Sequence, residues 1–454
     1  MIRIPCLALA TSTSICEQDM LGMAMLSGLT RRGARIQHFR SQACPLGSDV
    51  AGRITGMPGR HLDSWLMQPE VRREVFARGI SGPVTLAMVE GRLRSTASCL
   101  STSPHNLDAA DVSGIGPLAQ SLQIPLVMVV KHDPNDPLHL PHIPEQAEGL
   151  MLDGFETREQ FDQFRSFIRM TCGRAVLGGM SAAPKLRQAV MEVPPGMPMP
   201  TDLIDALATE FDAYADWAAI AALADSRPFS WSGELGARVR ADRSRFRVAY
   251  ARDEAFGGYF PDTLETLSSL GAELVEFSPI HDGALPDHPD LVMIGCGFPD
   301  NHIEALTENV SMITALSSHV CNGRRIYAEG GGAAYLGQTM SIDGRIHNGV
   351  GILPLNAVLQ MNQPPPWPVI RTLTNDSWLG PRGTTVRGYS SGRWKFSPAD
   401  HPGRCPGRAA PLCGELDMYK YHHAVGGLLH LHLAALPEVV EAFVGPHRPS
   451  LTLP

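Results

Sequence analysis

The stretch that decides the fold is IYAEGGGAAYLG, residues 326–337. A short apolar run is followed by three glycines and then by small and apolar residues, which predicts a buried strand, a tight turn and a helix. At such a turn many acyl-transfer enzymes hold their nucleophile on a sharp elbow. Here the residue at that place is Gly330, which offers neither a sulfur nor a hydroxyl.

Outward from this stretch, short apolar runs alternate with amphipathic segments in both halves of the chain. Runs that are apolar throughout are typical of parallel strands covered on both faces. The sequence therefore predicts two α/β domains, each a doubly wound and mostly parallel sheet. The predicted strands are residues 2–10, 34–40, 83–91, 124–131, 149–154 and 174–179 in the first half, and 247–253, 272–279, 291–297, 325–331 and 427–434 in the second.

The composition changes between the two halves. Residues 226–245 become polar and basic and end in ARVRADRSR, which indicates an interdomain linker. We therefore expect domains at 1–225 and 246–446, followed by a tail at 447–454. The expected helices include 19–33, 260–271 and 305–321.

Composition narrows the classes of function. A net charge of −8 and a pI near 6.1 lack the basic surplus typical of nucleic-acid binding. The nine cysteines are odd in number and scattered, which favours reduced thiols over a disulfide framework. The sequence shows no apolar run of membrane-spanning length, and the N-terminal segment lacks the pattern of a signal peptide. We expect a cytoplasmic protein without membrane contact.

Five segments of the second half, residues 251–279, 294–312, 326–337, 381–390 and 427–434, resemble the glutamine amidotransferase domain of the cobyrinic acid a,c-diamide synthases. Segments 28–40, 54–67 and 87–93 are similar to the ATP-dependent synthetase domain of the same family. The resemblance implies a P-loop NTPase-like first domain and a class I glutamine amidotransferase-like second domain. Members of the family activate a macrocycle carboxylate with Mg-ATP and attack it with ammonia taken from glutamine.

The family's phosphate-binding loop aligns with positions 14–20, where its glycines, lysine and hydroxyl are replaced. Ser14, Glu17, Gln18 and Asp19 stand there, so two carboxylates replace groups that would hold polyphosphate and Mg²⁺. The resemblance thus predicts a degenerate nucleotide loop, and we expect no ATP or Mg²⁺ bound in the family's manner.

Four further residues are candidates for a substrate cleft. Asp63 and Trp65 lie in a segment shared with the family, Glu90 is the acid at the end of a predicted strand, and Tyr389 begins the run that replaces the family's His-Glu-x-His. Packing is the better account of Asp63 and Trp65. For Glu90, a solvated or capping carboxylate is an equally good account.

The glutaminase site needs a thiol, a histidine and backbone donors for the oxyanion. His430 occupies the family's catalytic histidine position, Gly295, Cys296 and Gly297 form the oxyanion loop, and Gly330 occupies the position of the nucleophile. The resemblance therefore predicts loss of glutaminase activity. Cys296 is the nearby sulfur, and its place on another strand end predicts that it aims elsewhere and packs as a small hydrophobe.

No metal site is predicted. His401, Cys405, Cys413, His422 and His423 cluster within 23 residues, but their spacing matches no common zinc pattern. His430 and His432 alternate on one predicted strand and are expected to face the same side, one of them toward the old cleft.

These observations lead to one hypothesis and two alternatives. The hypothesis is a catalytically inactive homologue that binds a tetrapyrrole or serves as a non-catalytic partner of an active paralogue, in a homo- or heterodimer. The first alternative is an active amidoligase of tetrapyrrole biosynthesis that uses free ammonia or an atypical site. The second is a purely structural subunit that binds no tetrapyrrole.

Overall fold

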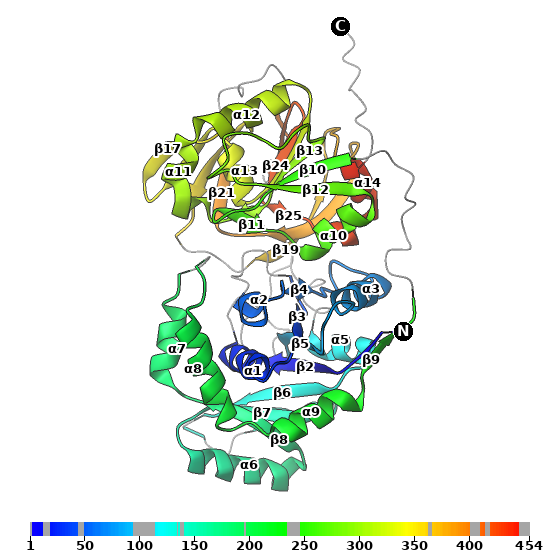
Figure 1. Cartoon of the computed structure of the whole chain (residues 1–454), viewed down its shortest axis with the longest axis vertical. Helices are drawn as coiled ribbons and strands as arrows, with labels where there is room; N and C mark the ends of the chain where they lie inside the picture. The colour runs from blue at the N-terminus through cyan, green and yellow to red at the C-terminus, as the bar shows by residue number, and fades with distance from the viewer. Residues whose placement is uncertain are drawn as a thin grey trace. The chain divides into compact units, whose positions relative to one another are not determined.

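In the computed structural model the chain divides into two compact units, Met1–Leu235 and Gly236–Pro454 (Figure 1). The structure describes residues 2–11, 19–43, 50–93, 114–133, 135–136, 140–194, 197–233, 246–361, 366–399, 409–413 and 418–444.

The first unit is built on a parallel sheet of seven strands, in the order β4-β3-β5-β2-β6-β7-β8. The central strands are buried almost throughout, since helices cover both faces of a parallel sheet. Five of the six strands predicted for this half are present. The sixth, predicted over 2–10, is divided at Pro5 into β1, which pairs with β9 (Phe229–Trp231), and β2, which joins the large sheet. The bounds are β1 Ile2–Ile4, β2 Cys6–Thr11, β3 Ile36–Arg40, β4 Arg60–His61, β5 Leu86–Arg92, β6 Leu126–Lys131, β7 Ala147–Phe155 and β8 Ala175–Ser181.

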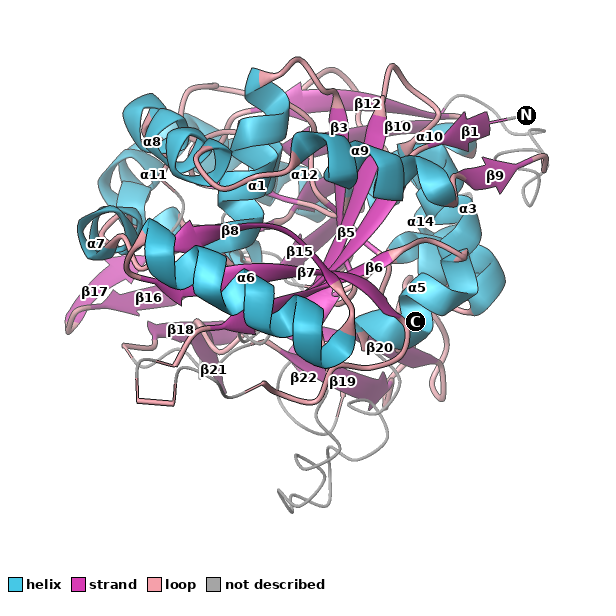
Figure 2. Ribbon diagram, turned by 90° about the horizontal axis from the view of Figure 1, so that it is seen from below, coloured by secondary structure: helices cyan, strands magenta, loops and turns pink. Residues whose placement is uncertain are grey.

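Helices α1, α8 and α9 share one hydrophobic cluster with the sheet. Helix α6 lies along β7 and β8 and buries Phe161, Phe164 and Ile168 (Figure 2). The result is the doubly wound arrangement that the alternating pattern predicted. The bounds are α1 Met20–Arg31, α2 Val50–Thr55, α3 Pro69–Gly79, α5 Ile115–Leu122, α6 Arg158–Cys172, α7 Pro184–Met191, α8 Thr201–Asp212 and α9 Trp217–Ser226.

The stretch after α9 differs in part from the expected linker. Residues 229–231 form β9, Phe229–Trp231, which pairs with β1 in an antiparallel ribbon. Phe229 is buried against Phe76 of α3, so this stretch packs with the first unit. The basic stretch 234–245 lies outside the described residues, and the linker itself stays a prediction.

The second unit contains a mixed sheet of seven strands, in the order β12-β10-β13-β15-β24-β23-β22. The five strands from β12 to β24 are parallel, and β23 and β22 add antiparallel pairs. The bounds are β10 Phe246–Ala251, β12 Ala272–Phe277, β13 Leu291–Ile294, β15 Arg325–Glu329, β22 Ala409–Pro411, β23 Met418–Tyr421 and β24 Ala424–Gly427.

Further elements complete this unit. The sequence predicted a helix at α10, a helix over α11 and α12, and a helix after the elbow, but it missed most of the short strands, whose pairing joins distant segments. The further elements are β11 Phe256–Gly258, α10 Pro261–Ser269, β14 Cys296–Gly297, η2 Pro299–His302, α11 Ile303–Glu308, α12 Val310–Cys321, α13 Gly331–Leu336, β16 Thr339–Ile342, β17 Arg345–Asn348, β18 Leu355–Leu359, β19 Trp367–Thr372, β20 Thr385–Ser390, β21 Trp394–Pro398, β25 Leu429–His430, η3 Leu433–Ala435 and α14 Pro437–Val444.

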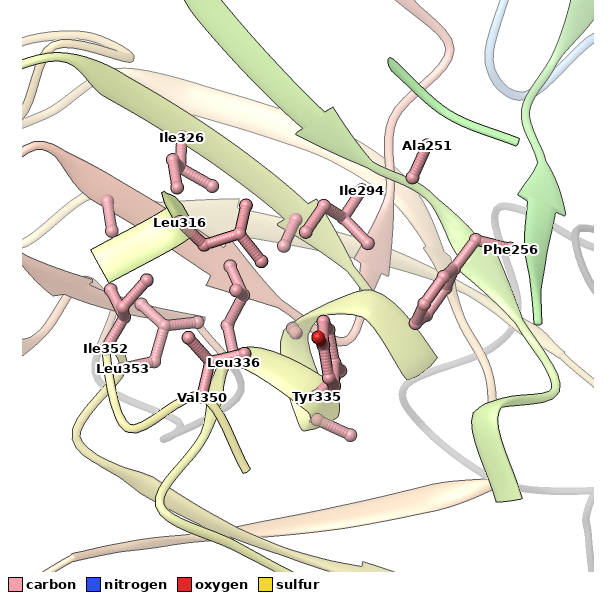
Figure 3. Close-up of a cluster of buried hydrophobic side chains, with 14 of the residues drawn as sticks. Ala251, Phe256, Ile294, Leu316, Ile326, Tyr335, Leu336, Val350, Ile352 and Leu353 are labelled. Atoms are coloured by element: carbon pink, nitrogen blue, oxygen red, sulfur yellow. The ribbon is translucent and has the colours of Figure 1, made fainter. Parts of the chain in front are cut away.

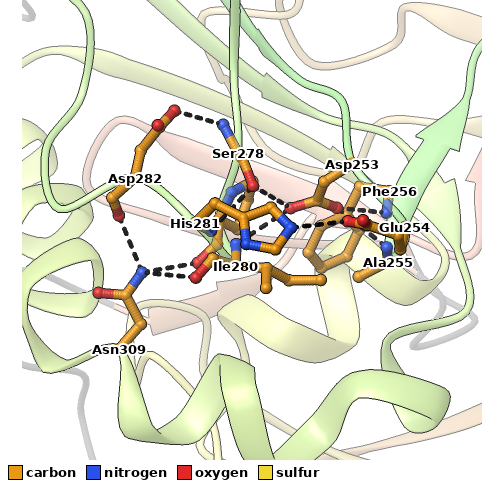
Figure 4. A network of polar contacts seen from close by, with 10 residues as sticks. Asp253, Glu254, Ala255, Phe256, Ser278, Ile280, His281, Asp282 and Asn309 are labelled. Atoms are coloured by element: carbon orange, nitrogen blue, oxygen red, sulfur yellow. Dashed lines mark hydrogen bonds and ion pairs between the residues drawn. The ribbon is translucent and has the colours of Figure 1, made fainter.

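The single helix expected over 305–321 is wrong, because the chain forms α11 and α12 with a break at Asn309. The Asn309 side chain accepts a hydrogen bond from the Met312 amide at 3.2 Å, as an N-cap does. Its amide nitrogen donates to the carbonyls of Pro279 and Asp282. The break therefore ties the start of α12 to the loop after β12 (Figure 4).

The single strand expected over 427–434 is also wrong. The chain leaves the main sheet after β24, and β25 pairs instead with β20, with Tyr389 opposite His430. This change of partner carries His430 to the end of β15, where the glycine-rich turn lies.

The helix after that turn, α13, is buried at every position. Tyr335 and Leu336 pack among Phe256, Ile294 and the loop 350–353 (Figure 3). The glycines at its start allow the close approach, because a Cβ at Gly332 would meet the Ile294 carbonyl and one at Gly331 would meet Pro299.

Two expectations about the whole chain can be compared with the structure. Cys321 is disulfide-bonded, so the expectation that every cysteine is a reduced thiol is wrong; Cys6 and Cys172 are not cross-linked. Among the described residues, no helix combines the length and the apolar character needed to cross a bilayer.

A substitution tests the packing of α13. A Cβ at Gly332 would lie 2.3 Å from the Ile294 carbonyl oxygen and 2.7 Å from that of Gly295. We expect Gly332→Ala to lower the free energy of unfolding of this unit by about 2 kcal/mol or more, since rigid backbone cannot yield. Urea unfolding measures it. Gly283→Ala is the control, because its Cβ would meet Ser311 Cβ at an ordinary 3.9 Å; equal effects at both sites would contradict the packing argument.

Candidate functional site

The glycine-rich stretch forms the elbow that the sequence predicts. Strand β15 ends at Glu329, Gly330 turns the chain with φ 52° and ψ −114°, and α13 begins at Gly331. This backbone conformation strains any residue with a Cβ and costs glycine little. The Gly330 amide donates to the Gly427 carbonyl at 2.8 Å, which fixes the turn against the end of β24.

The elbow position faces the imidazole of His430. A Cβ built on Gly330 would lie 2.8 Å from His430 Cε1 and 3.3 Å from Cys296 Cβ. A side chain at 330 would therefore point at the histidine, as a nucleophile and its base require. The same distances mean that no side chain fits there while His430 and Cys296 keep their positions.

The imidazole has a carboxylate behind it. His430 Nδ1 lies 3.5 Å from Glu329 Oε2. The other oxygen of Glu329 accepts hydrogen bonds from the Tyr327 hydroxyl at 2.8 Å and the Leu431 amide at 2.9 Å. Glu329 is thus held on one side and orients the histidine on the other.

This histidine carries a proton at neutral pH. Burial alone would lower the pKa of His430, but the interactions with Cys296 and Glu329 outweigh burial and raise that pKa to about 10. His430 and Cys296 are fully buried and Glu329 is 8% exposed. An imidazolium enclosed between a carboxylate and a sulfur is therefore the central charge of the site.

Cys296 corrects an expectation. The sequence reading aimed its sulfur away from the elbow, yet the structure places it in contact with His430, opposite Gly330. The reason is the short ribbon of β11 and β14, in which Cys296 pairs with Gly258 and turns inward. The Cys296 thiol also donates to the Gly258 carbonyl, with sulfur and oxygen 2.9 Å apart.

The predicted oxyanion loop is tied to its surroundings. The Gly295 amide donates to the Tyr259 hydroxyl at 2.9 Å, and that hydroxyl donates to the Met293 carbonyl at 3.0 Å. The Phe298 amide donates to the Ala255 carbonyl at 2.9 Å. The Gly295 amide is therefore occupied in this state, and the loop presents a closed form of the site.

A carboxylate holds the neighbouring strand in place. Asp253 accepts hydrogen bonds from the amides of Ala255 and Phe256 through one oxygen, and from Ser278 and Ile280 through the other (Figure 4). These bonds fix the loop before β11 and, through the Ala255 carbonyl, the loop of Cys296.

His430 and His432 have different partners. His432 Nε2 lies 3.9 Å from Asp262 Oδ2, and its ring packs on Phe260. The two histidines therefore do not form a ligand pair. In the described part of the chain no group of three or more His, Cys, Asp or Glu side chains could hold a metal ion. Of the five clustered candidates, His401 and Cys405 lie outside the described residues; Cys413 is buried and the rings of His422 and His423 contact each other.

The first unit places a carboxylate at the start of α1. Ser14, Glu17 and Gln18 lie outside the described residues, but Asp19 caps the helix and accepts from the amides of Leu21 and Gly22 at 2.9 and 3.2 Å. Helix N-terminal amides are the groups that bind phosphate. Here the chain's own carboxylate takes two of them.

A second carboxylate lies nearby. Glu90 Oε2 pairs with His38 Nε2 at 3.0 Å, and it also lies 3.4 Å from where a Gly22 Cβ would be. Burial, then the charge of Glu90, raises the pKa of Asp19 to about 7. Burial alone would raise the pKa of Glu90, but the hydrogen bond and charge of His38 lower it. The negative charge thus concentrates on Glu90.

The other cleft candidates have structural partners. Asp63 is fully buried and accepts from the amides of Ala43, Trp65 and Leu66, so it organises a turn. Trp65 is half-buried beside it. Tyr389 is buried and lies opposite His430 on β20. The structure brings Cys296, His430 and Gly330 together in the second unit, while Asp19 and Glu90 gather in the first.

Comparison with known proteins agrees with this geometry. Residues 247–391 match the CobB/CobQ-like glutamine amidotransferase domain. A crystal structure of a glutamine amidotransferase aligns with 44% of this chain and 99% of its own, at 16% identity and a TM-score of 0.33. Within the second unit, residues 247–391 thus match the family model of a glutamine amidotransferase domain.

The relationship extends beyond that domain. A cobyrinate a,c-diamide synthase of Syntrophotalea carbinolica is 24% identical over 97% of this chain and 98% of its own length. The synthase of Methanothermobacter thermautotrophicus is 25% identical over 96% and 98%. The chain is thus similar along nearly its whole length to cobyrinate a,c-diamide synthases.

Sequence reasoning missed two members of these clusters. Glu329 directly precedes Gly330 in the opening stretch, and a carboxylate ending an apolar strand was an available signal for it. His38 lies inside the buried strand β3 and gave no signal, since its pairing with Glu90 joins β3 to β5.

The Glu329–His430 pair can be tested by titration. We expect Glu329→Gln to lower the pKa of His430 from about 10, because a nearby negative charge is lost. A histidine whose pKa is raised by folding stabilises the folded state, and this stabilisation is fully present below the unfolded pKa of 6.5. The stabilisation is lost as the pH rises toward 10. The variant's loss of stability should therefore be largest near pH 6 and shrink at high pH. NMR of the imidazole measures the pKa of His430. Glu276→Gln, at an exposed carboxylate, is the control. An unchanged pKa of His430 in Glu329→Gln would contradict the pairing.

The Asp19 carboxylate predicts the opposite pH dependence. Its pKa is raised from 3.8 to about 7, so ionisation opposes folding and stability falls between those values. Asn keeps the capping oxygen and cannot ionise. We expect Asp19→Asn to be more stable than the parent at pH 8 and nearly equal at pH 4, at about 1.4 kcal/mol for each unit of the shift. Thermal unfolding at both pH values measures the difference. Asp216→Asn, at the exposed cap of α9, is the control and should show no such gain.

Proposed function

We propose that the protein takes part in the amidation of a carboxylate-bearing tetrapyrrole of the cobyrinate type. In this proposal the second unit takes ammonia from glutamine, and it does so without the elbow thiol of the family. The relationship to cobyrinate a,c-diamide synthases along nearly the whole chain supports the substrate class. The amidotransferase domain at 247–391 supports the nitrogen donor.

The observation that carries the proposal is the charged pair of Glu329 and His430 in a buried site. Removing an ion pair from water costs several kcal/mol for each ion, and the attraction between the two ions returns about the same amount. Apolar side chains of similar volume would stabilise the fold as well or better. A chain that needed only a scaffold would gain nothing from a protonated imidazole aimed at the elbow. In this proposal the pair serves proton transfer in an acyl-transfer site, which the 3.5 Å approach of Glu329 Oε2 to His430 Nδ1 supports.

A second candidate function rests on the first unit. Asp19 occupies amides at the start of α1, and Glu90 adds negative charge near them. Both features oppose binding of a polyphosphate at that helix. They favour a subunit that binds the tetrapyrrole, or a partner enzyme, without activating the carboxylate itself. Location in the cytoplasm and dimerisation remain predictions of the sequence.

The two functions differ in one assay. Purified protein is incubated with cobyrinate and Mg-ATP, with either glutamine or ammonium as nitrogen donor, and amides are detected by mass spectrometry. Amidation with both donors supports the synthase. The binding subunit is supported instead if neither donor gives amidation and the cobyrinate absorption spectrum changes saturably when protein is added.

One variant tests the role of the histidine. We expect His430→Gln to lower glutamine-dependent amidation by on the order of 10²-fold or more and to leave ammonium-dependent amidation unchanged, because proton transfer serves only the glutamine reaction. His347→Gln on β17 is the matched control and should change neither rate. A parallel loss with both donors would show that His430 maintains the fold and not the reaction.

A further inference from the structure

We propose that Cys296 supplies the nucleophile that Gly330 lacks, so that Cys296, His430 and Glu329 form a relocated thiol site acting on the carboxamide of glutamine. This inference rests on the proposed function and names the residue that performs its first step. The sulfur has moved from the elbow to the loop that faces it.

The space around the sulfur favours this exchange. A Cβ at Gly330 would lie 3.3 Å from Cys296 Cβ. A side chain at position 330 would therefore crowd the side chain of Cys296, and glycine at 330 leaves room for it. On the other side, a Cβ at Gly258 would lie 2.4 Å from Cys296 Sγ. The Cys296 side chain thus fits between two glycines, one from the elbow and one from β11.

The order of the three groups is that of a thiol protease or amidase triad. The Cys296 and His430 side chains both border the space beside Gly330, within 3.3 Å of where its Cβ would be, and the imidazole Nδ1 lies 3.5 Å from the Glu329 carboxylate. Glu329 is held in turn by the Tyr327 hydroxyl and the Leu431 amide. Nucleophile, base and orienting carboxylate are the parts that covalent acyl transfer needs.

An inert buried cysteine would have different neighbours. Buried cysteines that serve packing behave as small hydrophobes among apolar side chains. Cys296 instead contacts His430, whose pKa of about 10 keeps it charged at neutral pH. A histidine beside a thiol is the base that accepts the thiol proton as the sulfur attacks. The described titratable groups that face the pair are Glu329 and Tyr259, and burial raises the pKa of Tyr259, so its hydroxyl stays neutral.

The reaction balances with glutamine and water alone. The Cys296 thiolate attacks the side-chain carboxamide carbon of glutamine and forms a carbon–sulfur bond. The carbon–nitrogen bond breaks, and the His430 imidazolium gives its proton to the departing ammonia. Water, deprotonated by the neutral His430, then attacks the thioester, the carbon–sulfur bond breaks, and glutamate leaves. The thiolate and the imidazolium are restored.

Glutamine cannot reach the sulfur in the closed form of the site. Cys296 and His430 have no exposed surface, the Gly295 amide is bonded to Tyr259, and the Cys296 thiol is bonded to the Gly258 carbonyl. Parting of the Gly295–Gly297 loop from Tyr259 and β11 would expose the sulfur. The same movement would release the Gly295 amide toward the developing oxyanion, as such a site requires.

Covalent labelling tests the inference on the intact chain. The electrophilic glutamine analogue 6-diazo-5-oxo-L-norleucine alkylates a thiol that attacks it, and tandem mass spectrometry locates the adduct. We expect one adduct, on Cys296, and no adduct in Cys296→Ala. Cys413→Ala is the control, because Cys413 is equally buried and lies outside the site. Absence of an adduct on Cys296 of the parent protein at a saturating concentration of the analogue overturns the inference. This outcome is measured on the parent protein, so it does not depend on the folding of any variant.

A kinetic experiment adds an independent readout. We expect Cys296→Ser to lower glutamine hydrolysis by at least on the order of 10²-fold, with ammonium-dependent amidation retained. Hydrolysis that persists in Cys296→Ser would overturn the inference.

The two proposals fail in different ways. Labelling of Cys296 with no amidation of cobyrinate from either donor would reject the proposed function and leave the thiol site standing. Amidation from ammonium with no labelling and no glutamine hydrolysis would reject the thiol site and leave the amidation standing.

Discussion

The second unit depends on one buried interaction, the ion pair of Glu329 and His430 at the end of β15. Both groups lie where water cannot solvate them, so each is acceptable only while the other is in place. Their positions require the turn at Gly330, the departure of the chain from β24 to β25, and the Tyr327 hydroxyl behind the carboxylate. The elbow is therefore a meeting point of three strands, and its geometry follows from all of them.

The sulfur of Cys296 belongs to the same arrangement. Its strand, β14, pairs with β11, and β11 is fixed through Ala255 and Asp253 to the loop after β12. A thiol can therefore face His430 from the loop side as well as from the elbow side, since both lie within one side chain of the imidazole. The glycine at the elbow and the cysteine on the loop are complementary in volume, and this makes the exchange of positions physically simple.

In the first unit a buried carboxylate also satisfies polar groups of the chain, and there it occupies amides that could otherwise bind an anion. The start of α1 offers amides suited to an anion, and Asp19 takes two of them. Glu90, paired with His38, keeps a negative charge close by, and the Asp19 carboxyl holds a proton up to a pKa of about 7. The chain's own carboxylate thus satisfies the amides at this helix start. Glu17, Gln18 and Asp19 in the sequence, and the capping role of Asp19 in the structure, both argue against a bound polyphosphate.

The sequence by itself determined the alternation of strands and helices, five strands of the first unit and the elbow at 326–337, because these follow from local periodicity and from glycine at a strained turn. It also identified His430 and Gly330 by resemblance. The tertiary structure decided what faces His430: Cys296, which the sequence aimed elsewhere, and Glu329, which it overlooked. It also decided the break at Asn309 and the split of 427–434 into β24 and β25. The reason is physical, since side-chain direction at a strand end is set by the partner strand, and the pairings of β11 with β14 and of β20 with β25 join segments far apart in the chain.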